Sequence, residues 1–320
     1  MRGGGGITLY FAPLEGVTGY IFRNAHSRYF SGVDKYFAPF ISTNQNHRFS
    51  GREMRDVLPE NNGGIPLVPQ LLSKNAGEFS AACARLHAMG YEEVNLNLGC
   101  PSGTVAAKGK GSGFLAFPEK LDRFLEAVFE DAPVRISVKT RLGLRDPEEF
   151  WPLLEIFNAY PISELIIHPR IQKDFYKHPV RPGFFERAAE LSAAPVCYNG
   201  GVKTPEDAMS KGSGAVMIGR GLVADPALAE KIRGGPPADM ARLRAFYDEV
   251  KAGYREAFQD DRNAMMRMKE LWFYLSGLFA EGEKGYAKLK KARDPREFDA
   301  LEARLFAGEL LPAIRGDVPW

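Results

Sequence analysis

The feature that most constrains the fold is a regular alternation of short β-rich runs with amphipathic stretches between residues 7 and 235. This alternation predicts parallel strands joined by crossover helices, and eight units within about 250 residues fit a (β/α)8 TIM barrel. An open doubly wound sheet would place a Gly-x-Gly-x-x-Gly turn after its first strand. The chain has Ala12-Pro13-Leu14-Glu15-Gly16 there, which favours the barrel. Its strands are predicted at residues 7–11, 35–40, 66–71, 93–96, 135–139, 164–168, 195–198 and 215–218.

Helices are expected between these strands. Residues 75–89 and 118–129 carry apolar side chains at three-to-four spacing, which is typical of a helix with one buried face. Asp146 and Thr204 each precede a proline and acidic residues, the pattern of a capped helix start. Residues 44–59 form the crossover with the weakest helical pattern.

The strand pattern stops after Gly234-Gly235-Pro236-Pro237, a composition typical of a domain boundary. Helices are expected beyond it at residues 239–258, 263–279, 283–292 and 294–306. The sequence therefore predicts a barrel over residues 1–235 and a small all-helical domain over residues 236–320.

Composition indicates the class of protein and its compartment. With 45% apolar residues, 26% charged residues and a net charge of +2, the chain is typical of a globular protein, and this balance does not indicate a nucleic-acid partner. No apolar run approaches the roughly 20 residues needed to cross a bilayer, and residues 1–6 resemble a glycine leader rather than a signal peptide. Its three cysteines are widely spaced, which predicts a reducing cytoplasm without disulfide or zinc. We expect a cytoplasmic monomer without a metal.

Cys100 is the first candidate for chemistry. It ends the apolar run that begins at Val94, precedes Pro101 and opens a glycine-rich loop. Active sites of barrels lie at the carboxyl ends of the strands. A thiol with its ordinary pKa of about 8.5 is protonated at neutral pH and suits a proton donor. Cys83 and Cys197 have no such context and are expected to be buried apolar residues.

Cationic side chains end the next two predicted strands. Lys139 is the last residue of the fifth predicted strand and Arg141 follows it, while His168 is the last residue of the sixth and Arg170 follows it. An ammonium held at a barrel mouth can stabilise negative charge on a cofactor or substrate, although a lysine that extends to the rim would look the same in the sequence. The arginines suit an anionic or polar ligand.

Two glycine turns follow the seventh and eighth strands. They are Asn199-Gly200-Gly201 and Gly219-Arg220-Gly221. Barrels commonly bind phosphate at these two positions through main-chain amides. The pair therefore predicts a phosphate-bearing cofactor, and no His or acidic cluster indicates a metal site.

In combination these segments resemble the dihydrouridine synthase family, FMN-dependent enzymes that reduce uridine in tRNA. The resemblance covers nearly the whole chain, and residues 267–274 are similar to the family's helical domain. It rests on residues 12–23, Asn97-Leu98-Gly99-Cys100-Pro101, Gly111-Ser112-Gly113-Phe114-Leu115, Lys139-Thr140-Arg141, His168-Pro169-Arg170 and the two glycine turns, all in the family's order.

The resemblance implies reduction of the C5=C6 bond of a uridine in folded RNA, above all tRNA. Reduced flavin N5 would supply the hydride, Cys100 the proton, and NADPH the electrons that reload the flavin, while the helical domain would bind RNA. The implied FMN contacts are Ala12, Pro13, Leu14, Gln70, Lys139, His168, Asn199, Gly200, Gly201, Gly219 and Arg220. The implied uridine contacts are Asn97, Arg141 and Arg170.

Some positions depart from the family's pattern. Glu15 replaces a small residue, Gly19 replaces an aspartate, and Pro169 replaces a glycine, which leaves the modified position of the RNA open. Two alternatives remain from the sequence. One is an FMN barrel reductase of a free pyrimidine, similar to dihydroorotate dehydrogenase, and the other is an RNA-binding barrel without catalysis.

Overall fold

The computed structural model describes residues 6–46, 48–212 and 214–315, so residues 1–5 of the expected glycine leader lie outside the described part. Contacts divide the chain into two compact units. Unit 1 comprises residues 1–34, 202–213 and 218–320, and unit 2 comprises residues 35–201 and 214–217. The predicted domain boundary after Gly235 stays a prediction.

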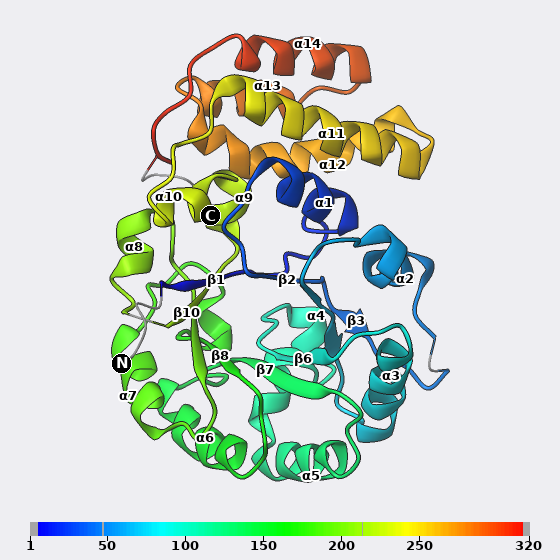
Figure 1. The fold of residues 1–320 in the computed structure, drawn as a ribbon, viewed down its shortest axis with the longest axis vertical. Helices are drawn as coiled ribbons and strands as arrows, with labels where there is room; N and C mark the ends of the chain where they lie inside the picture. Colours follow the sequence, from blue (N-terminus) through cyan, green and yellow to red (C-terminus); the bar gives the residue numbers. More distant parts are fainter. Residues whose placement is uncertain (1–5, 47, 213, 316–320) are drawn as a thin grey trace. The chain divides into compact units, whose positions relative to one another are not determined.

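Unit 2 is built on parallel strands that follow one another in the order β3-β5-β6-β7-β8-β9-β10, and β2 pairs with β4 (Figure 1). The strands are β2 (Lys35–Phe37), β3 (Ile41–Ser42), β4 (Leu67–Val68), β5 (Gln70–Leu72), β6 (Glu93–Leu98), β7 (Arg135–Arg141), β8 (Leu165–His168), β9 (Val196–Asn199) and β10 (Ala215–Ile218). The helices are α2 (Gly51–Val57), α3 (Ala76–Ala88), α4 (Gly103–Ala106), α5 (Pro118–Phe129), α6 (Phe150–Asn158) and α7 (Pro182–Leu191). Short 3-10 turns cover Pro59–Asn61, Gly111–Ala116, Pro147–Glu149 and Gln172–Asp174.

Every predicted strand is present, with several differences of extent. Strand β2 ends at Phe37 rather than at residue 40, and the short strand β3 was not predicted. The third predicted run is two strands, β4 and β5, because Pro69 between them has no N–H to offer a sheet. Strands β6 and β7 run two residues further than predicted, so Asn97 and Arg141 lie inside strands. Predicted caps also form, since Asp146 and Thr204 each accept a main-chain N–H within a capping box.

The strands of unit 2 separate apolar from polar side chains by their two-residue period. Val94, Leu96 and Leu98 of β6 belong to the apolar cluster beneath the helices, which also contains side chains of α3, α5 and α6. Asn95 and Asn97 therefore lie on the opposite face, toward the inside of the sheet's curve. The residues that are candidates for chemistry project from this second face.

Unit 1 joins the first strand to the tail helices. Its elements are β1 (Thr8–Phe11), α1 (Tyr20–Tyr29), α8 (Pro205–Met209), α9 (Arg220–Ala224), α10 (Leu228–Ile232), α11 (Met240–Phe258), α12 (Asp261–Leu275), a 3-10 turn (Ser276–Leu278), α13 (Gly282–Leu289) and α14 (Pro295–Phe306). Tyr247 of α11, Trp272 of α12 and Phe306 of α14 contact one another at the centre of the tail, drawn yellow to red in Figure 1.

Helix α1 packs against α11 through an aromatic cluster. Phe22, His26 and Phe30 surround the ring of Phe246, with centroid distances of 5.5 to 6.4 Å. The His26 Nε2 atom lies 3.0 Å from the carbonyl of Pro226, and burial lowers the pKa of His26 to about 3. Helix α1 is thus bound to the tail by a buried aromatic cluster, and an ion pair between Arg28 and Glu249 adds a surface contact.

The predicted α/β, TIM-barrel-like fold followed by C-terminal helices is confirmed. Within the described residues, no helix combines the length and apolar character needed to span a membrane.

Candidate active site

Polar side chains line the inner face of β5 to β9 near the carboxyl ends of these strands. Asn97 of β6 pairs in register with Lys139 of β7, and Arg141 of β7 pairs with His168 of β8. Because paired residues of adjacent strands point to the same face, these four side chains share one surface of unit 2. The structure therefore brings together the residues that the sequence predicted at this end of the sheet.

Lys139 is a half-buried cation in this row. Desolvation lowers the pKa of its ammonium from 10.5 to about 8, and the nearby charge of Arg141 acts in the same direction. Among the described residues, no hydrogen-bond or ion-pair partner contacts its Nζ atom. A cation held without an anion in a partly desolvated position favours a negatively charged or electron-rich ligand.

Gln70 is completely buried in a chain of amides next to Lys139. Asn97 Nδ2 donates to Gln70 Oε1 over 2.7 Å, and Gln70 Nε2 donates to Asn95 Oδ1 over 2.8 Å. Asn95 Nδ2 in turn donates to Ser137 Oγ over 3.0 Å. The chain fixes the amide orientations of all three residues, and it leaves Gln70 one N–H for a ligand.

Cys100 lies two residues beyond the end of β6 and is half-buried, whereas Cys83 and Cys197 are buried. Burial raises the pKa of Cys83 to about 12 and holds that of Cys197 well above its ordinary range. The expectation that these two are apolar core residues is therefore met by their burial. Cys100 is the cysteine that solvent or a substrate can reach.

Both predicted substrate arginines are engaged with the protein itself. The buried guanidinium of Arg141 donates to the carbonyls of Gly99, Ile171 and Phe175 over 2.9 to 3.0 Å. Arg170 donates from Nε to the carbonyl of His178 over 2.6 Å. These contacts position the loops around the site.

His168 lies beside Arg170. The Arg170 Nη1 atom is 2.8 Å from His168 Nε2. Because a guanidinium can only donate, this imidazole nitrogen accepts, and the proton of a neutral His168 is assigned to Nδ1. The ring also lies 6.1 Å from that of Tyr176, an exposed aromatic residue that the sequence reasoning did not single out.

The first glycine turn lies against His168 in unit 2. Gly200 has a φ of +121°, and a Cβ there would lie 2.6 Å from His168 Cδ2. Gly201 follows with a φ of +72°, and Asn199 Nδ2 donates to the carbonyl of Met217 over 2.8 Å. Only glycine fits the Gly200 position, which leaves main-chain groups accessible at close range.

The second set of predicted cofactor residues lies in unit 1. Ala12 donates its N–H to the carbonyl of Ile218 over 2.8 Å, and a Cβ on Gly219 would lie 3.1 Å from Leu14 Cδ1. Pro13, between them, is half-buried. The loop after β1 and the turn after β10 are therefore neighbours, as the predicted site requires.

A basic pair follows the glycine turns. Arg220 begins α9, and the Lys203 ammonium has its pKa lowered by desolvation and by the charge of Arg220. Sequence reasoning missed Lys203, although it stands two residues after Gly201 in the same turn. The two cations within unit 1 suit an anionic group such as a phosphate. In unit 2, the ammonium of Lys139 suits an electron-rich ligand.

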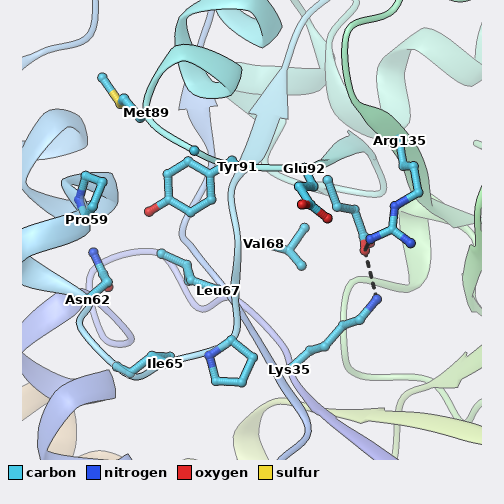
Figure 2. A pocket seen from close by; sticks show the side chains of 13 residues that line it. Lys35, Pro59, Asn62, Ile65, Leu67, Val68, Met89, Tyr91, Glu92 and Arg135 are labelled. Carbon is cyan, nitrogen blue, oxygen red and sulfur yellow. Dashed lines mark hydrogen bonds and ion pairs between the residues drawn. The ribbon is translucent and has the colours of Figure 1, made fainter.

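A cavity of about 450 Å³ lies elsewhere in unit 2. Figure 2 shows it between the amino-terminal ends of the strands, where Lys35, Glu92 and Arg135 line it together with Tyr91 and Met89. No predicted site residue lines this cavity. Among the described residues, no group of three or more His, Cys, Asp or Glu side chains could hold a metal ion.

Comparison with known proteins decides the family. The model of the dihydrouridine synthase (Dus) family matches residues 10–299. The chain belongs to the dihydrouridine synthase family. It is therefore an enzyme of a family of flavin-dependent oxidoreductases.

Individual relatives carry the same description. A tRNA-dihydrouridine(16) synthase of Cupriavidus necator is 28% identical over 315 residues, covering 92% of this chain and 95% of that protein. One of Ralstonia nicotianae is 32% identical over 243 residues, covering 71% and 72%. A probable tRNA-dihydrouridine synthase of Staphylococcus epidermidis is 30% identical over 230 residues, covering 69% and 70%.

Proposed function

We propose that this dihydrouridine synthase family member reduces a uridine of tRNA to 5,6-dihydrouridine as a monomeric cytoplasmic enzyme that uses FMN and NADPH. The observation that carries the proposal is that two reactive groups occur near the carboxyl ends of adjacent strands. The half-buried thiol of Cys100 follows β6, and the partly desolvated ammonium of Lys139 projects from β7. The names of the relatives support tRNA as the substrate, and position 16 is the first to test.

FMN would supply the hydride for the C5=C6 bond when bound and reduced, and NADPH would reduce it again. Lys139 would hold its ammonium toward negative charge on the ring system. The amide of Gln70 and the imidazole of His168 would add hydrogen bonds. The remaining contacts are proposed for Ala12, Pro13, Leu14, Asn199, Gly200, Gly201, Gly219 and Arg220.

Cys100 would donate its thiol proton to C5 of the uracil, and the resulting thiolate would regain a proton from solvent. Its partial exposure permits this return, which a buried thiol such as Cys83 could not achieve. Asn97, Arg141 and Arg170 are proposed to contact the uridine. The uracil must leave its stack to reach the site, at a cost of a few kcal/mol that RNA contacts of residues 236–320 would offset.

The test is Cys100→Ala in the full chain. A positioned general acid contributes about 100- to 10,000-fold, so dihydrouridine formation in tRNA should fall by at least about 100-fold. Bound flavin and its reduction by NADPH should stay unchanged. Cys83→Ala, which removes a core thiol, is the matched control and should retain activity. Full activity of Cys100→Ala would exclude the cysteine as the donor.

A second assay separates the proposed substrate from the alternative. The intact enzyme is given tRNA that lacks dihydrouridine, and in parallel free uridine, UMP and orotate. Reduction of tRNA alone is expected. Faster reduction of a free pyrimidine would favour the small-molecule reductase. Flavin binding without any reduction of either substrate would favour an RNA-binding protein that has lost catalysis.

A further inference from the structure

The turn that carries Cys100 is held by side chains on every main-chain polar group it has. Asn97 Oδ1 accepts the N–H groups of Gly99 and Cys100, over 3.0 and 2.9 Å. These two bonds fix the amino side of the turn from within the same strand. The main chain that carries the thiol therefore cannot rotate without breaking both hydrogen bonds.

The carbonyl groups of the turn are held from three other segments. Arg141 Nε donates to the Gly99 carbonyl over 3.0 Å. Ser112 donates to the Cys100 carbonyl twice, from Oγ over 2.7 Å and from its N–H over 3.2 Å. Gln172 Nε2 donates to the Pro101 carbonyl over 3.0 Å.

The residues that hold the turn are themselves fixed. Ser112 is fully buried, and Arg141 also bonds the carbonyls of Ile171 and Phe175. Gly111, with a φ of +57°, brings its backbone so close that a Cβ would lie 3.0 Å from Cys100 Cβ. Since the orientation of Asn97 is set by the amide chain through Gln70, the turn is tied to β5, β6, β7 and two loops.

We propose that Ser112, Asn97, Arg141 and Gln172 are positioning residues that hold the Cys100 thiol in one place for proton donation. The inference rests on the proposed function. It gives Asn97 and Arg141 a second role beside their proposed contact with the uridine, and it adds Ser112 and Gln172, which are not among the proposed contacts of FMN or uridine. Gly99 is buried and needs protein partners for its main-chain groups, but Cys100 and Pro101 are half-buried and could bond water instead. Side chains nevertheless bond all five main-chain groups of these three residues. A proton donor that must meet C5 at hydrogen-bond distance needs such placement.

The test is a double-mutant cycle with Ser112→Ala and Cys100→Ala in the full-length FMN-loaded enzyme. Single-turnover dihydrouridine formation at saturating tRNA should fall about tenfold in Ser112→Ala, with an unchanged KM for tRNA and unchanged flavin reduction by NADPH. In the Cys100→Ala background the same change should have less than a twofold effect, because Ser112 acts through the thiol. Equal losses in both backgrounds, or no loss in either, would overturn the proposal.

Ser192→Ala is the matched control. Ser192 Oγ also donates to a main-chain carbonyl, that of Ala194, over 2.9 Å, but it lies beyond α7 and touches no candidate site residue. It should leave both rates unchanged. If Ser112→Ala does not fold, as judged by its far-UV circular dichroism, Gln172→Ala takes its place with an expected loss of about threefold.

An RNA-free measurement separates this proposal from the proposed function. Alkylation of Cys100 by iodoacetamide is followed in the flavin-loaded enzyme, where Cys83 and Cys197 are buried and should react slowly. We expect Ser112→Ala to react at least threefold faster, because a freed turn exposes the half-buried sulfur more often. An unchanged alkylation rate would refute the positioning role even if the wild type reduced no RNA. Faster alkylation without any RNA reduction would instead refute the proposed function alone.

Discussion

Replacing Lys139 with methionine should stabilise the folded protein while it abolishes catalysis. Desolvation lowers the pKa of this ammonium from 10.5 to about 8. Each unit of pKa corresponds to about 1.4 kcal/mol, so the charged lysine costs the folded state about 3 kcal/mol at pH 7. Methionine has a similar length and no charge, and Lys139→Met removes this cost. A position that lowers stability without a protein partner is typical of a functional site.

The sign of the pH dependence follows from the lowered pKa. Below pH 8 the lysine is charged in both the folded and the unfolded chain, so the difference in stability between wild type and variant is constant. Between about pH 8 and 10.5 the unfolded chain still holds a proton that the folded chain has released. The stability of the wild type therefore rises with pH relative to Lys139→Met, and the advantage of the variant disappears near pH 10.5.

The assay is urea denaturation of both proteins, freed of flavin, at pH 7 and pH 10. Lys120→Met, on the exposed side of α5, is the control and should change stability by less than about 0.5 kcal/mol. A Lys139→Met variant no more stable than wild type at pH 7 would refute a desolvated, unpaired ammonium. A stability difference between Lys139→Met and wild type that is equal at pH 7 and pH 10 would also refute it.

Two further changes test the tail helices and the glycine turn. Lys251→Met leaves the carboxylate of Glu302, which is 1% exposed, without its cation, and thermal denaturation should show a loss of about 3–5 kcal/mol. Arg244→Met, at a more exposed ion pair on the same helix, should lower stability by less than about 1 kcal/mol. Equal losses of stability in Lys251→Met and Arg244→Met would contradict a buried Lys251–Glu302 pair. Gly200→Ala places a Cβ within 2.6 Å of an imidazole carbon and should cost about 1–3 kcal/mol in urea denaturation. Gly183→Ala in α7 is the control, because a Cβ there meets nothing within 4 Å, and it should not lower the stability of the protein. Equal urea midpoints for Gly200→Ala and Gly183→Ala would exclude the clash at Gly200.

The elements that could be predicted are those whose local chemistry marks them. Helices α3 and α14 begin at Asn75 and Asp294, whose side chains accept main-chain N–H groups, and both were expected from the sequence. No residue range was predicted for the crossover helices α1 and α7, which begin at Gly19 and Arg181 without a side-chain cap. These two helices depend on tertiary packing, which a single sequence does not display.

The sequence could predict where the candidate site residues lie on the strands, but it could not predict which groups they contact. The location of Cys100 and Lys139 near the carboxyl ends of strands was predicted because strand period and glycine turns are local signals, although β7 continues past Lys139 to Arg141. That Arg141 bonds three carbonyls could not be inferred, since its partners Ile171 and Phe175 lie 30 or more residues away in the chain. Ser112 was noted only as part of a motif, because a serine in a glycine-rich loop has no signal of its own.

The contact of α1 with α11 limits how the enzyme can be divided. Phe22, His26 and Phe30 come from the segment just after β1, yet they are buried against Phe246 of the tail. Deleting the tail would expose this aromatic cluster to water and leave helix α1 without its packing partner. A chimaera that exchanges the tail helices with those of a relative therefore has to exchange the α1 segment as well, even though the two segments are more than 200 residues apart.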